Sequence, residues 1–527
     1  MSDSSTLPTQ EPLTAVELSL FSSRLTALCQ EMGAVLQRSA FSPNIRDRLD
    51  YSCALFDRQG RLCAQAAHIP VHLGSMAWAM KDLVQAVEWQ RGDMLVVNDP
   101  FQGGTHLPDI TLVMPVFVNQ ELLCFVANRA HHADIGSQMP GSMPVSDSLE
   151  EEGVLIPPRL LLAAGKRDEA FWQQLMRQMG NPAQSEGDFV AQISANQIGA
   201  KAAEALAQGQ VEQFALQLAQ VNDYAARLAA KSFQQIPNGV YQFEDVLDDD
   251  GCGSELIKLC CELTIENGRC VVDFAGTAVQ VAGNVNCPLS VTAAGVMYVF
   301  RCLLPAETPA CAGAFEAIDI KAPLGSVLNA KAPAAVAAGN VETSTRVADV
   351  VMGALAQAIP ERVAAASHGS MNNLAMGARQ AANNGVSANW DYYETMGGGA
   401  GASAHNPGLS ARQTHMTNTL NTPIEVLEHH YPLRVTEYAV RTGSGGQGQQ
   451  SGGDGIVREM QFLEPTQLSL LTERRSSAPW GLQGGEPGQV GVNRLNGDVL
   501  PAKVNLQVQL GEKLRIETPG GGGYGSC

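Results

Sequence analysis

Two short segments of the sequence concentrate histidine and aspartate. They read NDPFQGGTHLPDI (residues 98–110) and NRAHHADIG (residues 128–136), and the candidate ligands in them are His106, Asp109, His131, His132 and Asp134. Two imidazoles with two or three carboxylates suit a borderline divalent ion such as Mn²⁺, Zn²⁺ or Fe²⁺, whereas a calcium site uses oxygen ligands alone. The alternative is a set of polar loop residues joined by hydrogen bonds. Glycine and proline in the first segment favour the metal site, because tight turns let short side chains converge.

The elements around these segments would bring them together. Residues 110–118 and 122–128 are rich in β-branched and apolar side chains, which indicates two strands joined by a short polar turn. Neighbouring antiparallel strands lie about 5 Å apart. Because one segment ends where this hairpin starts and the other begins where it ends, we expect the two clusters to face each other.

Further carboxylates are candidates for the same site. Asp47 and Asp50 stand in NIRDRLD, just before a strand-like run, although an aspartate beside an arginine is more often a surface ion pair. Asp99 lies on a glycine-rich turn, where the alternative role is to cap that turn. Glu394 precedes the glycine run 397–399, and such a run lets a backbone approach a ligand closely.

Other catalytic signatures are weak or missing. The pattern GxGxxG fits Gly443, Gly445 and Gly448, but no amphipathic helix follows, as a dinucleotide site requires. The sequence contains neither a GxxxxGK[ST] P-loop nor a GxSxG nucleophile elbow. Twelve cysteines without a CxxC pair indicate reduced, mostly buried thiols, with Cys53 as the candidate if one were catalytic. Any ATP that the protein uses is therefore expected on another chain.

The charge balance excludes several classes of partner. With 53 acidic and 34 basic residues the formal charge is −19, so a nucleic acid or an anionic membrane surface would be repelled. Residues 1–14 are polar and lack the basic and apolar regions of a signal peptide, and no apolar run reaches the roughly 18 to 20 residues of a membrane span. We expect a cytoplasmic protein.

Helices and strands are expected to share the chain. Apolar spacing and turn residues predict helices over 15–39, 163–232, 291–303 and 346–358, and strands over 51–56, 62–65, 94–97 and 239–276. The sequence from residue 373 onward is rich in glycine and loops. We predict an α+β fold with an N-terminal metal-bearing lobe (1–236), a mixed middle lobe (237–372) and a Gly-rich, β-rich C-terminal lobe (373–527).

Ordered motifs along nearly the whole chain give it a family resemblance. These motifs, which include SPNIRDRLDYSCALFD, HHADIG, EEGVLIPP, NVETSTRVADVV and YYETMGGGAGA, cover residues 42–57, 98–109, 131–136, 140–144, 151–158, 194–200, 340–351, 392–402, 414–428 and 518–525. The sequence resembles the hydantoinase B family. That family includes the second half of 5-oxoprolinase and a large subunit of acetone and acetophenone carboxylases.

The resemblance implies a single metal site. Carried over by motif, its ligands are Asp47, His106, Asp109 and His131. The family commonly has glutamate at the position of Asp47, which makes this side chain shorter by one methylene. The resemblance leaves Asp99, His132 and Asp134 to orient the imidazoles by hydrogen bonds, and Glu394 to contact substrate.

The resemblance also implies a partner and a reaction. The partner is a hydantoinase A-type subunit with an actin-like ATPase fold, which would bind ATP with Mg²⁺ and phosphorylate the oxygen of a cyclic amide. The metal subunit of this hetero-oligomer would then hydrolyse the activated C–N bond. One alternative is a subunit of an ATP-dependent acetone-type or acetophenone-type carboxylase. Another is a scaffold without catalytic function that stabilises the ATPase.

Overall fold

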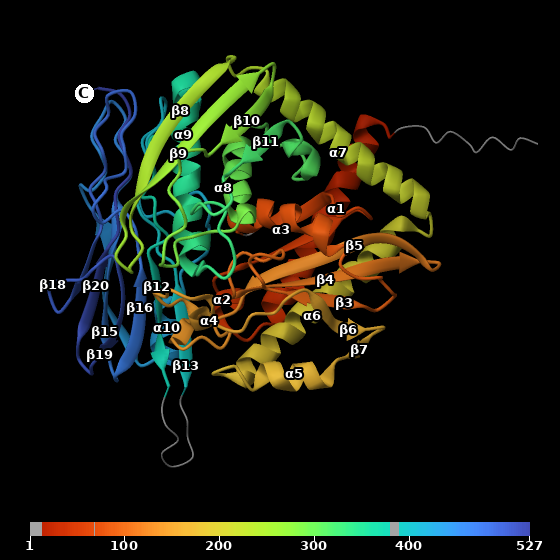
Figure 1. The fold of residues 1–527 in the computed structure, drawn as a ribbon, viewed down its shortest axis with the longest axis horizontal. Coiled ribbons are helices and arrows are strands. Elements are labelled where there is room, and N and C mark those ends of the chain that lie inside the picture. Colours follow the sequence, from red (N-terminus) through yellow and green to blue (C-terminus); the bar gives the residue numbers. More distant parts are fainter. Residues whose placement is uncertain (1–12, 68, 380–388, 527) are drawn as a thin grey trace, which may run out of the picture.

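Mixed helices and strands form the first part of the molecule, and strands dominate the last part. The computed structural model describes residues 13–67, 69–379 and 389–526. Figure 1 shows the N-terminal sheet and its helices on one side, the C-terminal sheets on the other, and the long strands β8 and β9 arching between them. This is the predicted α+β class.

A seven-stranded antiparallel sheet forms the N-terminal part, with strand order β2-β1-β5-β4-β3-β6-β7. Its strands are β1 (Tyr51–Phe56), β2 (Leu62–Ala67), β3 (Met94–Val97), β4 (Asp109–Val118), β5 (Glu121–His131), β6 (Arg159–Ala163) and β7 (Lys166–Arg167). The sequence predicted the first five of these strands to within a few residues. It missed the short hairpin of β6 and β7.

Helices cover both faces of this sheet. In β1, Cys53 and Leu55 join the core that includes α1 (Ala15–Ser39) and α6 (Pro182–Ala207), whereas Ala54 and Phe56 join the core of α3 (Pro70–Leu83). Successive side chains of a strand point to opposite faces. Because both faces are covered, β1 is buried along its whole length and reads as a continuous apolar run.

The predicted first helix has the bounds that its sequence indicates. Thr14 caps it, because the Thr14 hydroxyl accepts a hydrogen bond from the backbone N–H of Glu17, and the Glu17 carboxylate in turn accepts from Thr14 N. The remaining helices of this half are α2 (Pro43–Arg46), α4 (Leu149–Glu152), α5 (Glu169–Met176) and α7 (Val211–Phe233), with a 3₁₀ turn at Pro140–Ser142. The predicted helical region 163–232 thus consists mainly of α5, α6 and α7.

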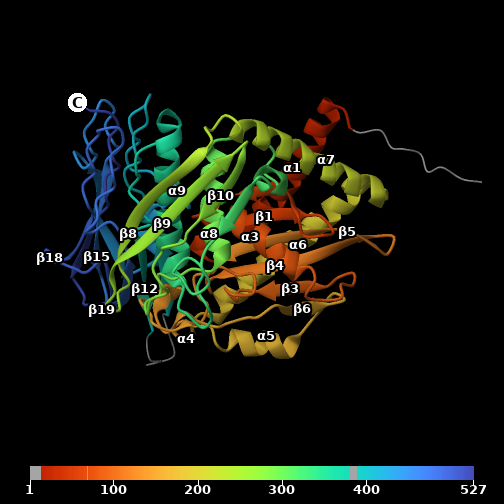
Figure 2. The same cartoon turned by 45° about the horizontal axis from the view of Figure 1, so that its top comes forward.

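A second sheet of four strands follows, in the order β11-β10-β9-β8. Its strands are β8 (Gly239–Asp249), β9 (Glu255–Glu266), β10 (Arg269–Asp273) and β11 (Ile318–Lys321), of which β10 and β11 run parallel. Two helices, α8 (Leu289–Cys302) and α9 (Ser344–Ala358), belong to this region, together with 3₁₀ turns at Ala312–Phe315 and Pro360–Arg362 and a π-helix at Gly339–Thr343. Figure 2 shows α8 beside α3 of the N-terminal part.

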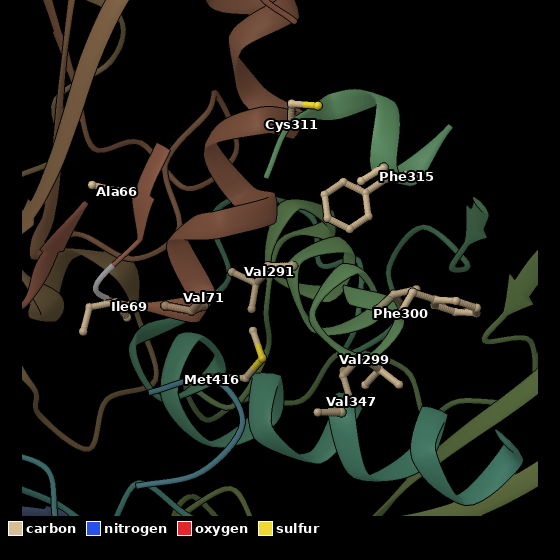
Figure 3. Packing of buried hydrophobic residues seen from close by; sticks show 14 of the residues in the cluster. Ala66, Ile69, Val71, Val291, Val299, Phe300, Cys311, Phe315, Val347 and Met416 are labelled. Atoms are coloured by element: carbon tan, nitrogen blue, oxygen red, sulfur yellow. The ribbon is translucent and has the colours of Figure 1, made fainter. Parts of the chain in front are cut away.

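The main hydrophobic core joins the first two parts of the chain. Figure 3 shows Val71 of α3, Val291 of α8 and Val347 of α9 near Met416, and all four are buried. Because this core runs across residue 237, it does not separate the first two predicted lobes. The division of the chain into three lobes stays a prediction.

Two further sheets form the C-terminal part, in the orders β13-β12-β16-β19 and β14-β15-β20-β17-β18. The strands are β12 (Asn373–Ala378), β13 (Trp390–Glu394), β14 (Leu433–Arg441), β15 (Gly455–Phe462), β16 (Thr466–Leu471), β17 (Val492–Leu495), β18 (Asp498–Val499), β19 (Lys503–Val508) and β20 (Lys513–Glu517), with one helix, α10 (Ile424–His430). This region holds more regular strands than its glycine content indicated.

The glycine-rich segments pack backbone against backbone. A Cβ atom on Gly399 would lie 1.9 Å from the carbonyl oxygen of Gly453, and one on Gly521 would lie 2.1 Å from that of Ala400. Backbone hydrogen bonds cross between the segments, from Gly453 N to Ala400 O and from Gly521 N to Gly453 O. Glycine is therefore required here for close packing. Within the described residues, no helix is both long and apolar enough to span a membrane.

Candidate metal centre

Asp109 and His131 face each other at the open end of the β4–β5 hairpin. They are direct cross-strand partners, at the first residue of β4 and the last residue of β5. His106 lies in the turn before β4, and its carbonyl accepts a hydrogen bond from Asp109 N. The hairpin therefore brings together the two segments that the sequence predicted to meet.

Three ligand atoms converge at this point. The Nε2 atoms of His106 and His131 and a carboxylate oxygen of Asp109 can lie within 4.8 Å of one another, and the three residues are between 0 and 3% exposed. Within the described residues, His106 Nε2, Asp109 Oδ1 and His131 Nε2 have no hydrogen-bond partner. Burying three such atoms without partners costs free energy. A divalent ion would satisfy all three, so this His–Asp–His set fits the metal that the resemblance implies.

Hydrogen bonds on the far side of the ligands set their orientation. His106 Nδ1 lies 3.3 Å from Ala337 O, to which it donates, so the lone pair of His106 is on Nε2. Oδ2 of Asp109 accepts hydrogen bonds from the Thr105 hydroxyl at 2.6 Å and from the amide of Asn340 at 3.3 Å. These bonds leave Oδ1 of Asp109 for the ion.

His131 is held by a ring and an amide. Its imidazole stacks on Tyr393 with 4.6 Å between ring centroids and an angle of 5° between the planes. Its Nδ1 lies 3.2 Å from the side-chain amide of Asn44. A metal on Nε2 requires the proton on Nδ1, so Asn44 must present its oxygen there. Oδ1 of Asn44 has no other partner in the described chain, so rotating the amide breaks no bond to that atom.

The protonation states also suit a metal. Burial, and then the neighbouring His106, hold the pKa of His131 well below its ordinary value, so the imidazole is neutral. Burial opposes ionisation of Asp109, but His106 and His72 together hold the pKa of this carboxyl well below its ordinary value. His72 Nε2 lies 3.4 Å from Asp109 Oδ2. A neutral imidazole and an ionised carboxylate are the forms that bind metal.

The three ligands border a small closed cavity. Its volume is about 20 Å³, which holds an ion or one water molecule but no ring substrate. Apolar side chains of Ile69, Val71, Val341 and Met371 form part of its wall. A separate cavity of about 580 Å³ is lined by residues 100–103 of the loop that leads to His106, and it shares no lining residue with the small one.

The structure places Asp50, and not Asp47, beside the three ligands. Asp47 forms an ion pair with its neighbour Arg46 at 3.0 Å, and its carboxylate is 19% exposed. Asp50 lines the small cavity, and its carbonyl accepts a hydrogen bond from His131 N. Burial raises the pKa of Asp50, although Arg48 at 4.0 Å opposes this. The ligand role predicted for Asp47 therefore has no geometric support, and the additional carboxylate is Asp50.

The other predicted histidine and its neighbour lie away from the three ligands. His132 follows His131 in the chain and points to the opposite side, where its Nε2 lies 2.9 Å from Gln192 Oε1 of α6. Asp134 accepts a hydrogen bond from the backbone N–H of Asn181, the N-cap of α6, at 2.6 Å. Both residues attach α6 to the sheet and do not hold an imidazole of the cluster.

Asp99 and Glu394 have structural partners of their own. Asp99 accepts hydrogen bonds from Phe101 N and from the Gln102 amide, so it caps its turn. Glu394 forms a buried ion pair with Arg458 at 2.7 Å. The glycine run that follows Glu394 packs against other backbone segments, which explains its composition without a ligand. Neither carboxylate belongs to the group of converging ligand atoms.

The candidate cysteine is also structural. Cys53 is fully buried in β1, and burial raises the pKa of its thiol well above the ordinary value. A thiol in this state is not a nucleophile. The described cysteines are free thiols, as predicted.

Four residues around the ligands were not identified from the sequence as part of the site. They are Asn44, His72, Asn340 and Tyr393. Three of them fall inside the family motifs, which was the available signal, whereas His72 lies alone in an apolar helix. Their roles depend on contacts that the chain makes only when folded.

Comparison with known proteins identifies the family. A model of the Hydantoinase B/oxoprolinase family matches residues 14–527. The chain belongs to this family. It is 38% identical to an uncharacterized protein of Methanocaldococcus jannaschii, over 97% of this chain and 90% of that protein. It is also 38% identical to 5-oxoprolinase 1 of Arabidopsis thaliana, over 97% of this chain but only 42% of the plant protein.

A solved structure of a family relative has the same fold. The ATP-dependent caprolactamase from Pseudomonas jessenii superposes with a TM-score of 0.90 at 28% sequence identity, covering 98% of this chain and 92% of that one. The chain spans about two fifths of the length of the plant 5-oxoprolinase. More than half of that longer protein therefore has no counterpart here.

Proposed function

We propose that this chain is the metal-bearing subunit of an ATP-dependent enzyme that hydrolyses the C–N bond of a cyclic amide, such as a hydantoin or 5-oxoproline. The observation that carries the proposal is the convergence of three buried ligand atoms, on His106, Asp109 and His131, that have no other partner in the described chain. Relatives named 5-oxoprolinase and ATP-dependent caprolactamase support the substrate class and the use of ATP.

The proposal assigns ATP to a second subunit of a hetero-oligomer. The sequence has no P-loop, and the 5-oxoprolinase relative is more than twice as long as this chain. A hydantoinase A-type ATPase would bind ATP with Mg²⁺ and transfer a phosphoryl group to the amide oxygen. An amide resists hydrolysis because its nitrogen donates electrons into the carbonyl group, and phosphorylation of the oxygen removes that resistance.

The residues of this chain then carry out the ring opening. A divalent ion bound by His106, Asp109 and His131 supplies Lewis-acid stabilisation of negative charge and lowers the pKa of water. Asp50 accepts a proton from the attacking water and passes it to the ring nitrogen as the C–N bond breaks. The acyl phosphate formed in this step loses phosphate to a second water. Val341 and Met371 keep bulk water away from the reacting groups.

Co-expression with the ATPase tests this function. The complex is supplied with ATP and with hydantoin, 5-oxoproline or a simple lactam, and phosphate and ring-opened product are measured together. Product formed in step with phosphate supports the proposal. Turnover only with a ketone and bicarbonate would replace it with a carboxylase. Full turnover by a His106→Ala, His131→Ala complex would reduce this chain to a scaffold.

A further inference from the structure

One segment of the middle region contacts the surroundings of all three ligands. We call residues 336–342 the brace segment. It starts more than two hundred residues after His106 in the chain, and its second half belongs to the π-helix Gly339–Thr343. π-Helical turns are rare and occur often at functional sites. The contacts of this segment are not used by the chemistry proposed above.

The start of the brace segment is fixed by Glu152 of α4. Oε1 of Glu152 accepts hydrogen bonds from Val336 N at 2.8 Å and Ala337 N at 3.0 Å, as well as from the Ser146 hydroxyl. The carbonyl of the same Ala337 accepts the hydrogen bond from His106 Nδ1. Glu152 therefore sets the position of the peptide group that fixes the tautomer of His106.

The middle of the segment contacts the second ligand. Asn340 donates from its amide to Asp109 Oδ2 at 3.3 Å. Gly339 allows the segment to come this close, since a Cβ atom there would lie 1.8 Å from the carbonyl oxygen of Asn286. The backbone of this part of the segment is therefore tightly confined.

The end of the segment reaches the third ligand through two residues. Oε1 of Glu342 accepts hydrogen bonds from Met371 N and, at 2.6 Å, from the side-chain amide of Asn373. The oxygen of that amide accepts from the Tyr393 hydroxyl at 2.6 Å. Tyr393 is the ring that stacks on His131. Glu342 therefore fixes which way Asn373 faces, and through it the ring that supports His131.

Stability alone gives no reason for these two carboxylates. Both are fully buried, neither forms an ion pair within the described residues, and Oε2 of each has no hydrogen-bond partner there. Burying a carboxyl group without a charge partner costs free energy, and an apolar side chain would avoid the cost. A role in fixing the position of other groups accounts for their presence.

We propose that Glu152 and Glu342 are positioning residues that anchor the two ends of the brace segment and thereby hold His106, Asp109 and His131 in the geometry of one metal site. This inference rests on the proposed metal centre. It assigns a role to the EEGVLIPP and NVETSTR motifs, which contain Glu152 and Glu342. Residues that orient metal ligands typically contribute 10-fold to 100-fold in metal affinity, an order-of-magnitude range.

Metal affinity of the full chain tests the inference without any assay of activity. Each chain is stripped of metal and titrated with Zn²⁺ against a competing chelator, and its visible spectrum is recorded with Co²⁺. We expect Glu152→Ala and Glu342→Ala each to bind Zn²⁺ about 10-fold to 100-fold more weakly than the unchanged chain and to show an altered Co²⁺ spectrum. Glu152→Gln and Glu342→Gln should restore most of the affinity, because the amide oxygen accepts the same hydrogen bonds.

Two exposed glutamates supply the controls. Glu150→Ala, two residues from Glu152, and Glu361→Ala change the charge equally and should leave affinity and spectrum unchanged. Unchanged Zn²⁺ affinity in both brace variants, with metal bound normally by the unchanged chain, overturns the brace while the metal centre stands. No metal binding by the unchanged chain overturns the centre itself. If an alanine variant fails to fold, Asn340→Ala decides, since unchanged affinity there also contradicts the inference.

Discussion

Asp109 and His131 are paired directly across two antiparallel strands, so the backbone register of one hairpin fixes two of the three metal ligands. His106 lies three residues before Asp109 and is tied to it by a backbone hydrogen bond. The cluster is therefore built on a rigid element within 26 residues of sequence, from position 106 to position 131. Substitutions in its surroundings should act on metal binding before they act on the fold.

The two aspartates near the start of β1 should behave differently. Asp50→Ala should slow ring opening by about 10²-fold or more, because it removes the carboxylate that lines the cavity. Asp47→Ala should change the rate by less than about 3-fold, because an exposed ion pair contributes little. The rate of product formation by the two variant complexes is the measurement. Equal losses would restore Asp47 as a ligand or deny Asp50 its role.

Asn44 should contribute to metal affinity through His131. Asn44→Ala leaves His131 Nδ1 without its partner and frees the ring to rotate. We expect Zn²⁺ to bind about 10-fold to 100-fold more weakly, with little change in the midpoint of thermal unfolding of the metal-free chain. Asn181→Ala, which alters a buried amide far from His131, is the control. Identical affinities for both variants would show that Asn44 does not orient the ligand.

Glu342 should make the stability of the metal-free chain depend on pH. Burial, and then the nearby Glu473, raise the pKa of Glu342 from 4.5 to about 8. Between these values the folded chain keeps a proton that the unfolded chain has released, so the contribution of Glu342 to stability falls as the pH rises through this window. The free energy of unfolding of Glu342→Gln, relative to the unchanged chain, should therefore increase from about pH 5 to about pH 8. Urea unfolding at several pH values measures it, and a constant difference would contradict the expectation.

His106 should affect ring opening more than phosphorylation. In the reconstituted complex, His106→Ala should lower the ring-opening rate by about 10³-fold or more, because a ligand of the Lewis acid is lost. Phosphate release should fall much less, since the ATPase subunit forms the activated amide independently and that species decays in water. Phosphate and product are measured in parallel. Equal losses of both would place His106 in substrate activation or in assembly.

The sequence predicted what lies close together along the chain. The β4–β5 hairpin, its register and the meeting of His106, Asp109 and His131 all follow from two strand-like runs with polar segments at their ends. The choice between Asp47 and Asp50 did not follow. Leu49 between them adopts a positive φ of 60°, a conformation that is rare for leucine, and neither composition nor spacing indicates it.

Contacts between distant parts of the chain were beyond prediction for a different reason. Ala337, Asn340 and Tyr393 reach the ligands only because the middle and C-terminal regions pack against the N-terminal sheet. His132 was assigned to the site because it neighbours His131, yet the alternation of side chains along the chain turns it toward α6. The glycine-rich C-terminal segments indicated loops, because no local pattern reveals that several of them pack together.

The metal content of the purified chain tests the central claim most directly. Elemental analysis should find about one divalent transition metal, Mn²⁺, Zn²⁺ or Fe²⁺, per chain in the unchanged protein, and almost none in the folded His106→Ala, His131→Ala double variant. With two of three ligands removed, the remaining carboxylate cannot compete with water for the ion. Full metal occupancy in the double variant would contradict the account, because the ion would then be bound elsewhere.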